Sequence, residues 1–385
     1  MTAKAYITDI AGFLPNAPVD NDTIESVLGM VAGRPSRSRT IVLRNNGIKT
    51  RHYAIDPATG RYTHTNAQMA AAAVRALAKK ADFDLNTLEC LCTGTSGPDL
   101  VQPSHGHMVH GELGTPPCEV HTAAAVCTSS MSALRYAMLN VRSGEHRHAI
   151  CTGSELSSRY MRGRNFEPEM EHLVAELEKR PEIAFEKDFL RWMLSDGAGA
   201  LLIEPAPRPG LNLRVEWIDI FSYAHLLPAC MYVGAEKQAD GALRGWMLYS
   251  AREREANSIF ALKQDVRLLN DEVIEHTLVK PLARVAAQRA LSPGDVDWFL
   301  PHYSSEYFRA PVADGLARAG LPIPQERWFT NLERVGNVGS ASIYIMLDEL
   351  LKSGRLRDGQ HLLCWVPESG RFSSGFIYLT ATAHA

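Results

Sequence analysis

The sequence lacks long apolar runs, strongly charged segments and regularly spaced cysteine pairs. Nowhere in its 385 residues do about 18 apolar residues run together, and its start lacks the apolar stretch and cleavage site of a secretion signal. The formal charge of −3 leaves no basic stripe for nucleic acid and no polybasic tail for a membrane surface. We therefore expect a cytoplasmic protein that binds neither nucleic acid nor a membrane.

The cysteines exclude two further classes of protein. There are seven of them, an odd number, and they are scattered without CxxC spacing, so neither a disulfide framework nor a zinc ribbon is predicted. A cluster of His105, His107 and His110 offers imidazoles, but neither a carboxylate nor a cysteine completes a recognisable ligand set. We expect these histidines to serve capping or loop chemistry, and we predict no metal.

Short apolar runs alternate with helical stretches along the whole chain. This pattern is typical of strands that are buried on both faces, and it predicts an α/β fold. The predicted strands are Ala5–Ile10, Cys90–Thr95, His148–Cys151, Ala200–Ile203, Trp298–Pro301, Leu362–Val366 and Phe376–Leu379.

Two windows of the sequence repeat at one offset. Residues 76–91 match residues 284–299 at an offset of 208, and both read as a helix end, a loop and a strand. The apolar and small positions of 132–139 fall opposite those of 340–347 at the same offset. Two independent windows with a shared offset predict a duplicated α/β unit.

The halves should meet near residue 205, where a run rich in proline follows an apolar strand. We therefore predict an N-terminal half, residues 1–205, and a C-terminal half, residues 206–385. Residues 157–190 and 222–262 break the parallel between them. We expect these insertions to form a cap over the substrate or a contact in a dimer.

Cys127 stands where a small apolar run meets a predicted helix. An apolar stripe at Met131, Leu134, Met138 and Val141 follows it and stops at a Ser-Gly pair. On the first turn of that helix, unpaired N–H groups would favour the thiolate and could stabilise an oxyanion. A lone cysteine on an apolar helix face is nevertheless more often a packed core residue, so the stretch alone decides nothing.

Nucleophilic cysteine chemistry requires a histidine and a polar partner. His302 follows a proline that ends a predicted strand, at the strand edge where α/β folds gather their sites. Asn337 lies in a glycine-flanked turn that opens the helix paired with that of Cys127 by the offset. Each has an ordinary alternative, a satisfied buried histidine and a turn asparagine. Together with Cys127 they predict a catalytic set.

The motifs around these residues resemble the thiolase superfamily, specifically β-ketoacyl-acyl-carrier-protein synthase III and related condensing enzymes. The resemblance rests on TAAAVCTSSMSAL, FLPHYSS and VGNVGSAS, with supporting matches at residues 46–54, 195–204 and 368–379. It implies a thiolase fold, in which two pseudo-symmetric βαβαβαββ halves form a five-layer αβαβα sandwich. It also implies a homodimer.

The resemblance implies a mechanism as well. Cys127 takes an acyl group from a thioester, and a carbanion from a second thioester, usually made by malonyl decarboxylation, attacks the acyl-enzyme. His302 and Asn337 donate hydrogen bonds to the enolate oxygen, while the backbone N–H groups of Cys127 and Gly370 form the oxyanion hole. No cofactor is implied, because the substrates arrive as phosphopantetheine thioesters.

Departures from the family pattern concern the substrate. The stretch PHYSSEYF puts Ser304 and Glu306 near the expected site. Residues 17–60 contain no tryptophan to stack on an adenine but several arginines that can meet phosphate, which favours an acyl carrier protein over coenzyme A as the donor. The expected carrier or phosphopantetheine contacts are Arg37, Arg44 and Arg51.

A narrower resemblance concerns residues 27–54 and 260–269. They are similar to a branch that makes dialkylresorcinol and cyclohexanedione precursors by joining a β-ketoacyl to an unsaturated acyl thioester and closing a ring. Two alternatives stay open. One is a cysteine-dependent acyltransferase acting on an alcohol or amine, against which Asn337 speaks because no enolate forms there. The other is a non-catalytic ketosynthase partner, against which the complete Cys, His and Asn set speaks.

Overall fold

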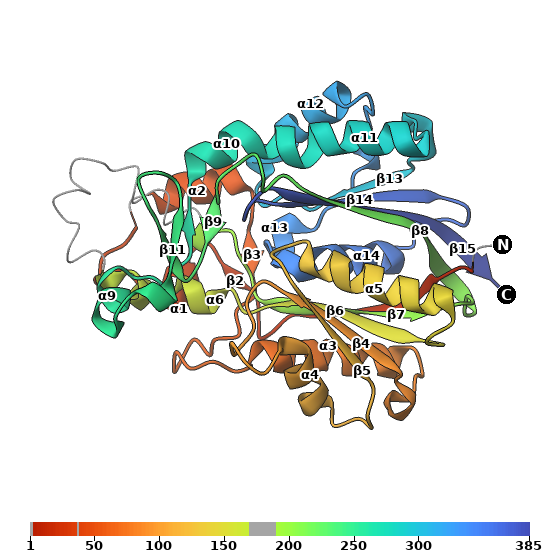
Figure 1. The fold of residues 1–385 in the computed structure, drawn as a ribbon, viewed down its shortest axis with the longest axis horizontal. Coiled ribbons are helices and arrows are strands. Elements are labelled where there is room, and N and C mark those ends of the chain that lie inside the picture. Colours follow the sequence, from red (N-terminus) through yellow and green to blue (C-terminus); the bar gives the residue numbers. More distant parts are fainter. Residues whose placement is uncertain (1–2, 37, 169–189) are drawn as a thin grey trace.

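The computed structural model describes residues 3–36, 38–168 and 190–385. Its elements stack in five layers of alternating helices and sheet (Figure 1). The strands are β1 (Tyr6–Phe13), β2 (Val19–Asp20), β3 (Thr50–Arg51), β4 (Cys90–Thr95), β5 (Glu119–Ala124), β6 (Ala149–Glu155), β7 (Gly197–Glu204), β8 (Gly210–Ser222), β9 (Met231–Tyr232), β10 (Ala235–Lys237), β11 (Leu243–Gly245), β12 (Lys263–Gln264), β13 (Trp298–Pro301), β14 (His361–Glu368) and β15 (Ser373–His384).

Helices cover both outer faces and fill the middle layer. The described α-helices are α1 (Ile24–Leu28), α2 (Arg39–Asn46), α3 (Asn66–Lys80), α4 (His105–Leu113), α5 (Ser129–Ser143), α6 (Ser158–Met161), α9 (Ala251–Ala256), α10 (Val266–Ile274), α11 (Lys280–Arg289), α12 (Arg309–Arg318), α13 (Leu332–Val335) and α14 (Ser342–Lys352). A π-helical turn, Glu275–Val279, joins α10 to α11. No helix of the described residues has both the length and the apolar character to cross a membrane.

The strand order repeats between the two halves. The strands run β5-β4-β6-β7-β1 in one sheet and β13-β14-β15-β8 in the other, and the sheets join through a short pairing of β1 with β8. In the second half a bridge between Phe299 and Trp328 stands in the place that β5 occupies in the first. The predicted thiolase architecture is confirmed, and every apolar run predicted as a strand overlaps one.

The offset of 208 relates the elements that carry the expected catalytic residues. It places the first residue of β4 on the first residue of β13, and it places β1 within β8. Helices α5 and α14, also related by this offset, lie in the middle layer between the sheets (Figure 1). The predicted stripe of α5 is fully buried, and the helix ends at Ser143 because Gly144 adopts a left-handed conformation.

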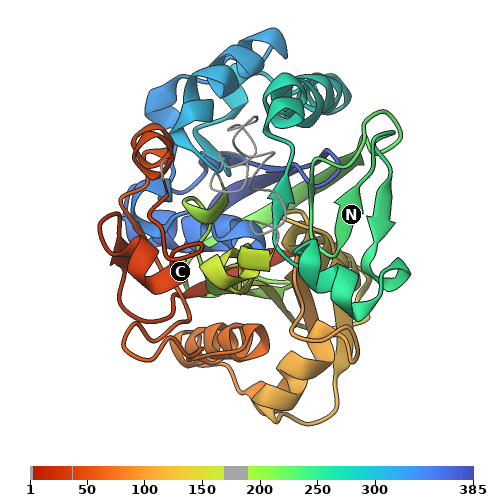
Figure 2. The same ribbon diagram turned by 90° about the vertical axis from the view of Figure 1, so that its left-hand side faces the viewer.

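The segments between β1 and α3, together with α6, α9 and strands β9–β11, gather at one end of the layers. This is the left-hand end in Figure 1, which faces the viewer in Figure 2. It is also the end to which the carboxyl ends of the parallel strands lead, since β4, β5 and β6 pair in parallel. Polar side chains at these strand ends therefore meet under the surrounding segments.

Close packing of α5 on the sheet depends on Gly94 of β4. A Cβ atom there would lie 2.5 Å from the backbone of both Ser129 and Ser130. We expect Gly94→Ala to lower the free energy of unfolding by about 1–3 kcal/mol, because α5 must move away from β4 to make room for the added methyl group. Gly111→Ala in α4, where a Cβ meets nothing, should raise it by about 0.5–1 kcal/mol. Equal effects of the two changes in urea unfolding would contradict this account.

Candidate active site

Cys127, His302 and Asn337 line one cavity of about 230 Å³. They come from three elements: the loop between β5 and α5, the end of β13, and the turn before α14. Their side chains are partly or fully buried. Three residues far apart in the sequence therefore converge on one cavity.

Glu368 holds the loop that carries Cys127. One of its carboxylate oxygens accepts hydrogen bonds from Val126 N at 3.0 Å, Thr128 N at 3.2 Å and Thr128 Oγ1 at 2.6 Å. These bonds occupy the N–H groups on both sides of Cys127, whose own N–H lies against its own thiol. The loop is thereby fixed with the sulfur facing the cavity.

The thiol of Cys127 does not have the electrostatics that the sequence predicted. Helix α5 begins at Ser129 after Thr128, so Cys127 lies before the helix and not on its first turn. Burial raises the pKa of the thiol well above its usual range, and the nearby carboxylates of Glu368 and Glu155 raise it further. The resting protein consequently holds a neutral thiol, and the expected stabilised thiolate is wrong.

His302 lies at the carboxyl end of β13, as the Pro-His pair predicted. Its backbone N–H bonds to Trp365 O of β14 at 2.8 Å, which continues the parallel pairing by one residue. Burial lowers the pKa of the imidazole to about 4, so the ring is neutral at neutral pH. A neutral imidazole carries one N–H donor, and its second ring nitrogen can accept.

Asn337 is fixed through both its backbone and its side chain. Its N–H bonds to Met193 O at 2.9 Å, and its carbonyl accepts from Ser195 N at 2.8 Å. Its Oδ1 accepts from Gly339 N at 2.8 Å, which assigns the other end of the amide as the donor. The side chain therefore offers an N–H₂ group to the cavity.

The two glycines that flank Asn337 are required for steric reasons. Both Gly336 and Gly339 have positive φ angles, 72° and 54°. A Cβ on Gly339 would lie 2.8 Å from Glu155 Cγ, and one on Gly336 would lie 2.9 Å from Arg51 Cγ. Only glycine fits both the conformation and the space.

Glu155, at the carboxyl end of β6, is a buried carboxylate on the cavity wall. It accepts from Ser96 N at 3.0 Å, from the Ser96 hydroxyl and from Ser340 N at 3.3 Å. Burial raises its pKa, although these donors oppose the shift. We did not predict Glu155 or Glu368 from the sequence. A usable signal was an acidic residue ending an otherwise buried strand, which both of them are.

The remaining cavity wall is largely apolar and belongs partly to the second insertion. Met231, Tyr232, Val233 and Leu262 supply one side of the wall, and α10 supplies another through Leu269, Val273 and Ile274. The segment 260–269 therefore faces the cavity. Most of the first insertion, residues 169–189, lies outside the described residues.

Of the other predicted site residues, some lie at the cavity or beside it and one does not. Ser304 lines the cavity, and Gly370 packs beside the Cys127 loop, where its Cβ would lie 3.0 Å from Val126 Cγ2. Glu306 does not line the cavity, because it starts a turn that directs its carboxylate to Tyr303 Oη at 3.0 Å and to Arg309 at 3.7 Å. Its predicted position as a site neighbour is corrected accordingly.

The three arginines differ in their exposure. Arg44 is exposed on α2, and Arg37 lies outside the described residues. Arg51 is fully buried, and its guanidinium bonds to Trp192 O at 2.6 and 3.0 Å and to Asn21. Burial lowers its pKa to about 10. Arg51 therefore holds the fold together and cannot meet a carrier's phosphate.

The histidines of α4 have separate partners. His105 is buried and bonds through Nε2 to Ser154 Oγ at 3.0 Å, whereas His107 bonds to Ser104 Oγ at 2.7 Å. His110 bonds to Pro116 O at 3.2 Å. His107 and His110 therefore make local capping and loop contacts as expected, whereas His105 instead joins α4 to strand β6.

Comparison with known proteins agrees with this geometry. Residues 118–208 match the family described as "Beta-ketoacyl synthase, N-terminal domain", and residues 286–378 match "3-Oxoacyl-[acyl-carrier-protein (ACP)] synthase III C terminal". The first match contains Cys127, and the second contains His302, Asn337 and Gly370.

Individual relatives cover nearly the whole chain. The β-ketoacyl-[acyl-carrier-protein] synthase III of Methylococcus capsulatus is 25% identical over 384 residues, 99% of each protein. The tetronic acid condensing enzyme AbyA1 superposes with a TM-score of 0.76 at 20% identity, over 98% of this chain and 99% of that one. A variant of Xanthomonas campestris OleA, with bound lauric acid and lauroyl-CoA, gives 0.71 at 18% identity, over 99% and 100%. In sequence and in fold the chain is therefore similar to the β-ketoacyl-acyl-carrier-protein synthase III-like condensing enzymes.

Proposed function

We propose that this enzyme forms an acyl-Cys127 intermediate and condenses it with a β-ketoacyl thioester, closing a ring to a cyclohexanedione or dialkylresorcinol precursor. The observation that carries the proposal is the shared cavity of Cys127, His302, Asn337 and the buried carboxylate of Glu155. In the first step the sulfur of Cys127 attacks an acyl thioester, and the carrier leaves as a thiol. The Cys127 and Gly370 N–H groups stabilise the oxyanion of this step.

The second step needs a carbanion, and Glu155 is the base that can make one without decarboxylation. The carbon between the two carbonyls of a β-ketoacyl thioester is acidic enough to lose a proton to a carboxylate whose pKa is raised by burial. The resulting enolate oxygen accepts hydrogen bonds from His302 and Asn337. The carbanion then attacks the acyl-Cys127 carbonyl, and the Cys127 thiolate leaves.

Ring closure requires a second carbon–carbon bond within the same cavity. An α,β-unsaturated acyl group offers that bond at its β-carbon, where a carbanion adds and the double-bond electrons become a new enolate. The apolar wall formed by β9 and α10 suits alkyl chains on both substrates. The proposed pair of substrates, one β-keto and one unsaturated acyl thioester, follows from the resemblance of residues 27–54 and 260–269 to the ring-forming branch, and the apolar wall is compatible with their alkyl chains.

The proposed donor is an acyl carrier protein, and the proposed reaction needs no cofactor. Arg44, exposed on α2, remains a candidate contact for a carrier's phosphate. We further propose a homodimer that uses β5. This strand is the last of its sheet, so one edge of its backbone is free to pair with another copy.

A cysteine-dependent transfer to an alcohol or amine is the second candidate function. The neutral His302 in the cavity favours it, since a neutral imidazole can remove a proton from an incoming hydroxyl or amine. The donor group of Asn337 has no task in such a transfer, because no enolate forms. Condensation uses the whole set and is therefore our conclusion.

Product analysis tests the proposal and separates the two sources of carbanion. With paired β-ketoacyl and enoyl groups on acyl carrier protein, we expect a ring product by mass spectrometry. Glu155→Gln should lower this rate about a hundredfold or more, since the base is lost, but should leave any malonyl-dependent condensation intact. Ser96→Ala, which leaves the carboxylate in place, is the matched control. Linear esters, amides or free acids as the main products would refute the proposal.

A further inference from the structure

A second group of reactive side chains lies at the opposite ends of the same parallel strands. Cys90, Glu119 and Ala149 begin β4, β5 and β6 and are register partners, whereas Cys127 follows the end of β5 and Glu155 ends β6. Five residue steps along β4 separate Cys90 from Thr95, roughly 17 Å. Nothing in the condensing mechanism uses this group.

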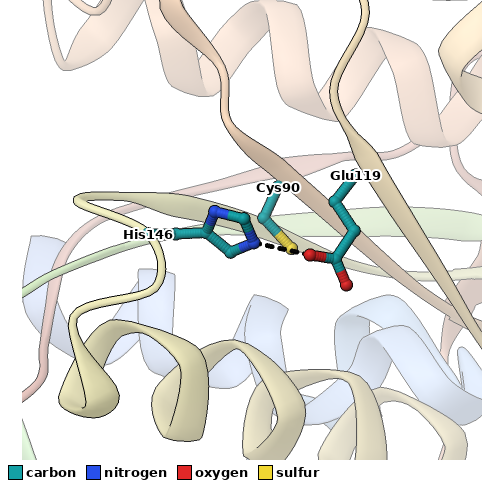
Figure 3. Close-up of side chains that lie close together, drawn as sticks. All are labelled: Cys90, Glu119 and His146. Carbon is teal, nitrogen blue, oxygen red and sulfur yellow. Dashed lines mark hydrogen bonds and ion pairs between the residues drawn. The ribbon is translucent and has the colours of Figure 1, made fainter.

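Three ligand atoms of different chemistry converge there. Cys90 Sγ, a carboxylate oxygen of Glu119 and a ring nitrogen of His146 all lie within 4.8 Å of one another (Figure 3). His146 comes from the turn after α5, and its Nε2 lies 2.6 Å from Glu119 Oε2. The thiol of Cys90 is fully buried beneath this pair and contacts Cys92 Sγ at 3.5 Å.

The carboxylate of Glu119 also has a hydrogen-bond partner on its oxygen that does not contact His146. The hydroxyl of Tyr136 donates to its other oxygen, and the ring of Tyr136 stacks on His121 at 3.9 Å. Such an outer partner orients a ligating carboxylate and leaves its second oxygen directed at the ion. The hydroxyl bond also lets Glu119 keep its position if its contact with His146 opens.

We propose that Cys90, Glu119 and His146 bind one Zn²⁺ ion, with water as the fourth ligand. Thiolate, imidazole and carboxylate together suit zinc, whereas Mg²⁺ and Ca²⁺ avoid sulfur. Tetrahedral bonds of about 2.0–2.3 Å put ligand atoms roughly 3.5 Å apart. The ion therefore enters between His146 and Glu119, which separate by about 1 Å, and the proton of the Cys90 thiol passes to solvent.

The site would tie the starts of the parallel strands β4 and β5 to the turn between α5 and β6, far from the active site. We assign it a stabilising role, because an ion that binds the folded chain and not the unfolded one raises stability by mass action. Glu119 lies 29 residues after Cys90, and His146 lies 27 residues after Glu119, so the ligands form no short spacing motif that the sequence would show. The register of the sheet pairs Cys90 with Glu119, and the turn after α5 brings His146 to them.

Metal titration tests this site with a spectroscopic readout. The full chain, untagged, chelator-treated and carrying Cys127→Ala to remove the active-site thiol, is titrated with Zn²⁺ by calorimetry and with Co²⁺ by absorption. We expect one equivalent of either ion, a thiolate-to-cobalt charge-transfer band, and a higher melting temperature with Zn²⁺. Cys90→Ala should abolish the band, and His146→Gln should weaken Zn²⁺ binding by at least about tenfold.

Matched controls are Cys118→Ala and His148→Gln, a thiol and an imidazole beside the site but outside the ligand set; both should bind as the parent does. Absence of binding in the parent, a band that survives Cys90→Ala, or equal losses in the controls would overturn the proposal. If Cys90→Ala does not fold, the exposed substitution Glu119→Gln decides instead, since it must weaken binding by the same factor. Condensing activity plays no part in this readout, so its outcome is independent of the proposed reaction.

Discussion

Cys127→Ala should form no acyl adduct when the enzyme is incubated with acylated carrier protein, while the parent gains the mass of one acyl group. Among the described residues, Cys127 is the one cysteine that lines the cavity shared with His302 and Asn337. Loss of the covalent route should lower condensation by several orders of magnitude, on the order of a millionfold where a nucleophile acts with its partners as a unit.

The adduct experiment has a close control in Cys118→Ala, which removes another partly exposed thiol. Intact-protein mass spectrometry should find the adduct unchanged in that variant. The rate of adduct formation in the parent should rise with pH through the neutral range, since the resting thiol has a raised pKa and reacts as the thiolate. An equal adduct on Cys127→Ala would show that acylation occurs elsewhere, and a rate independent of pH would contradict the buried neutral thiol.

The fold could be predicted from the sequence because buried strands give recurring apolar runs and the duplicated halves give a constant offset. Buried strands such as β4 and β13 read as apolar runs, and the offset between them survives because the same layer contacts constrain both halves. β5 was harder to predict, since it is an edge strand whose residues are small or polar. The equivalent position in the second half holds only a bridge between Phe299 and Trp328. An edge position needs little apolar burial, so it leaves little pattern in the sequence.

The site was predictable where a residue's role coincides with a turn or a strand end. Cys127, His302 and Asn337 all lie at such positions, and the cavity brings them together. Electrostatics was not predictable, because the pKa of Cys127 depends on Glu155 and Glu368, which come from other strands. Arg51 illustrates the same limit: its burial follows from contacts with Trp192 and Asn21, which are distant in sequence.

Glu306 failed as a site neighbour for a related reason. Sequence proximity to His302 suggested that its carboxylate faces the substrate, but the chain turns into a 3₁₀ helix at Glu306 and the side chain pairs with Arg309. Two carboxylates did occupy the site, and both arrived at the ends of buried strands. In a layered α/β fold, the strand end is therefore a better guide to the site than nearness along the chain.

Asn337→Ala should leave acylation of Cys127 intact and lower condensation about a hundredfold to a thousandfold, the effect of removing one oxyanion donor. In the proposed reaction the acyl step uses backbone donors, whereas the enolate needs the amide N–H₂ of Asn337 and the N–H of His302. Adduct mass and product formation are measured on the same sample, so the two steps are scored separately.

The Asn337 amide also has a structural bond, which a second substitution isolates. Asn337→Asp keeps an oxygen that can accept from Gly339 N, now bonded at 2.8 Å, but offers no N–H₂ donor and adds a charge that repels an enolate. It should lose condensation as fully as Asn337→Ala does, whereas rescue by Asp would mean that Asn337 merely shapes the turn. Asn331→Ala, which removes a buried asparagine that bonds to Glu349 and does not line the cavity, should retain both steps. Loss of acylation together with condensation in a folded Asn337→Ala protein would remove Asn337 from the enolate step and favour transfer to an alcohol or amine.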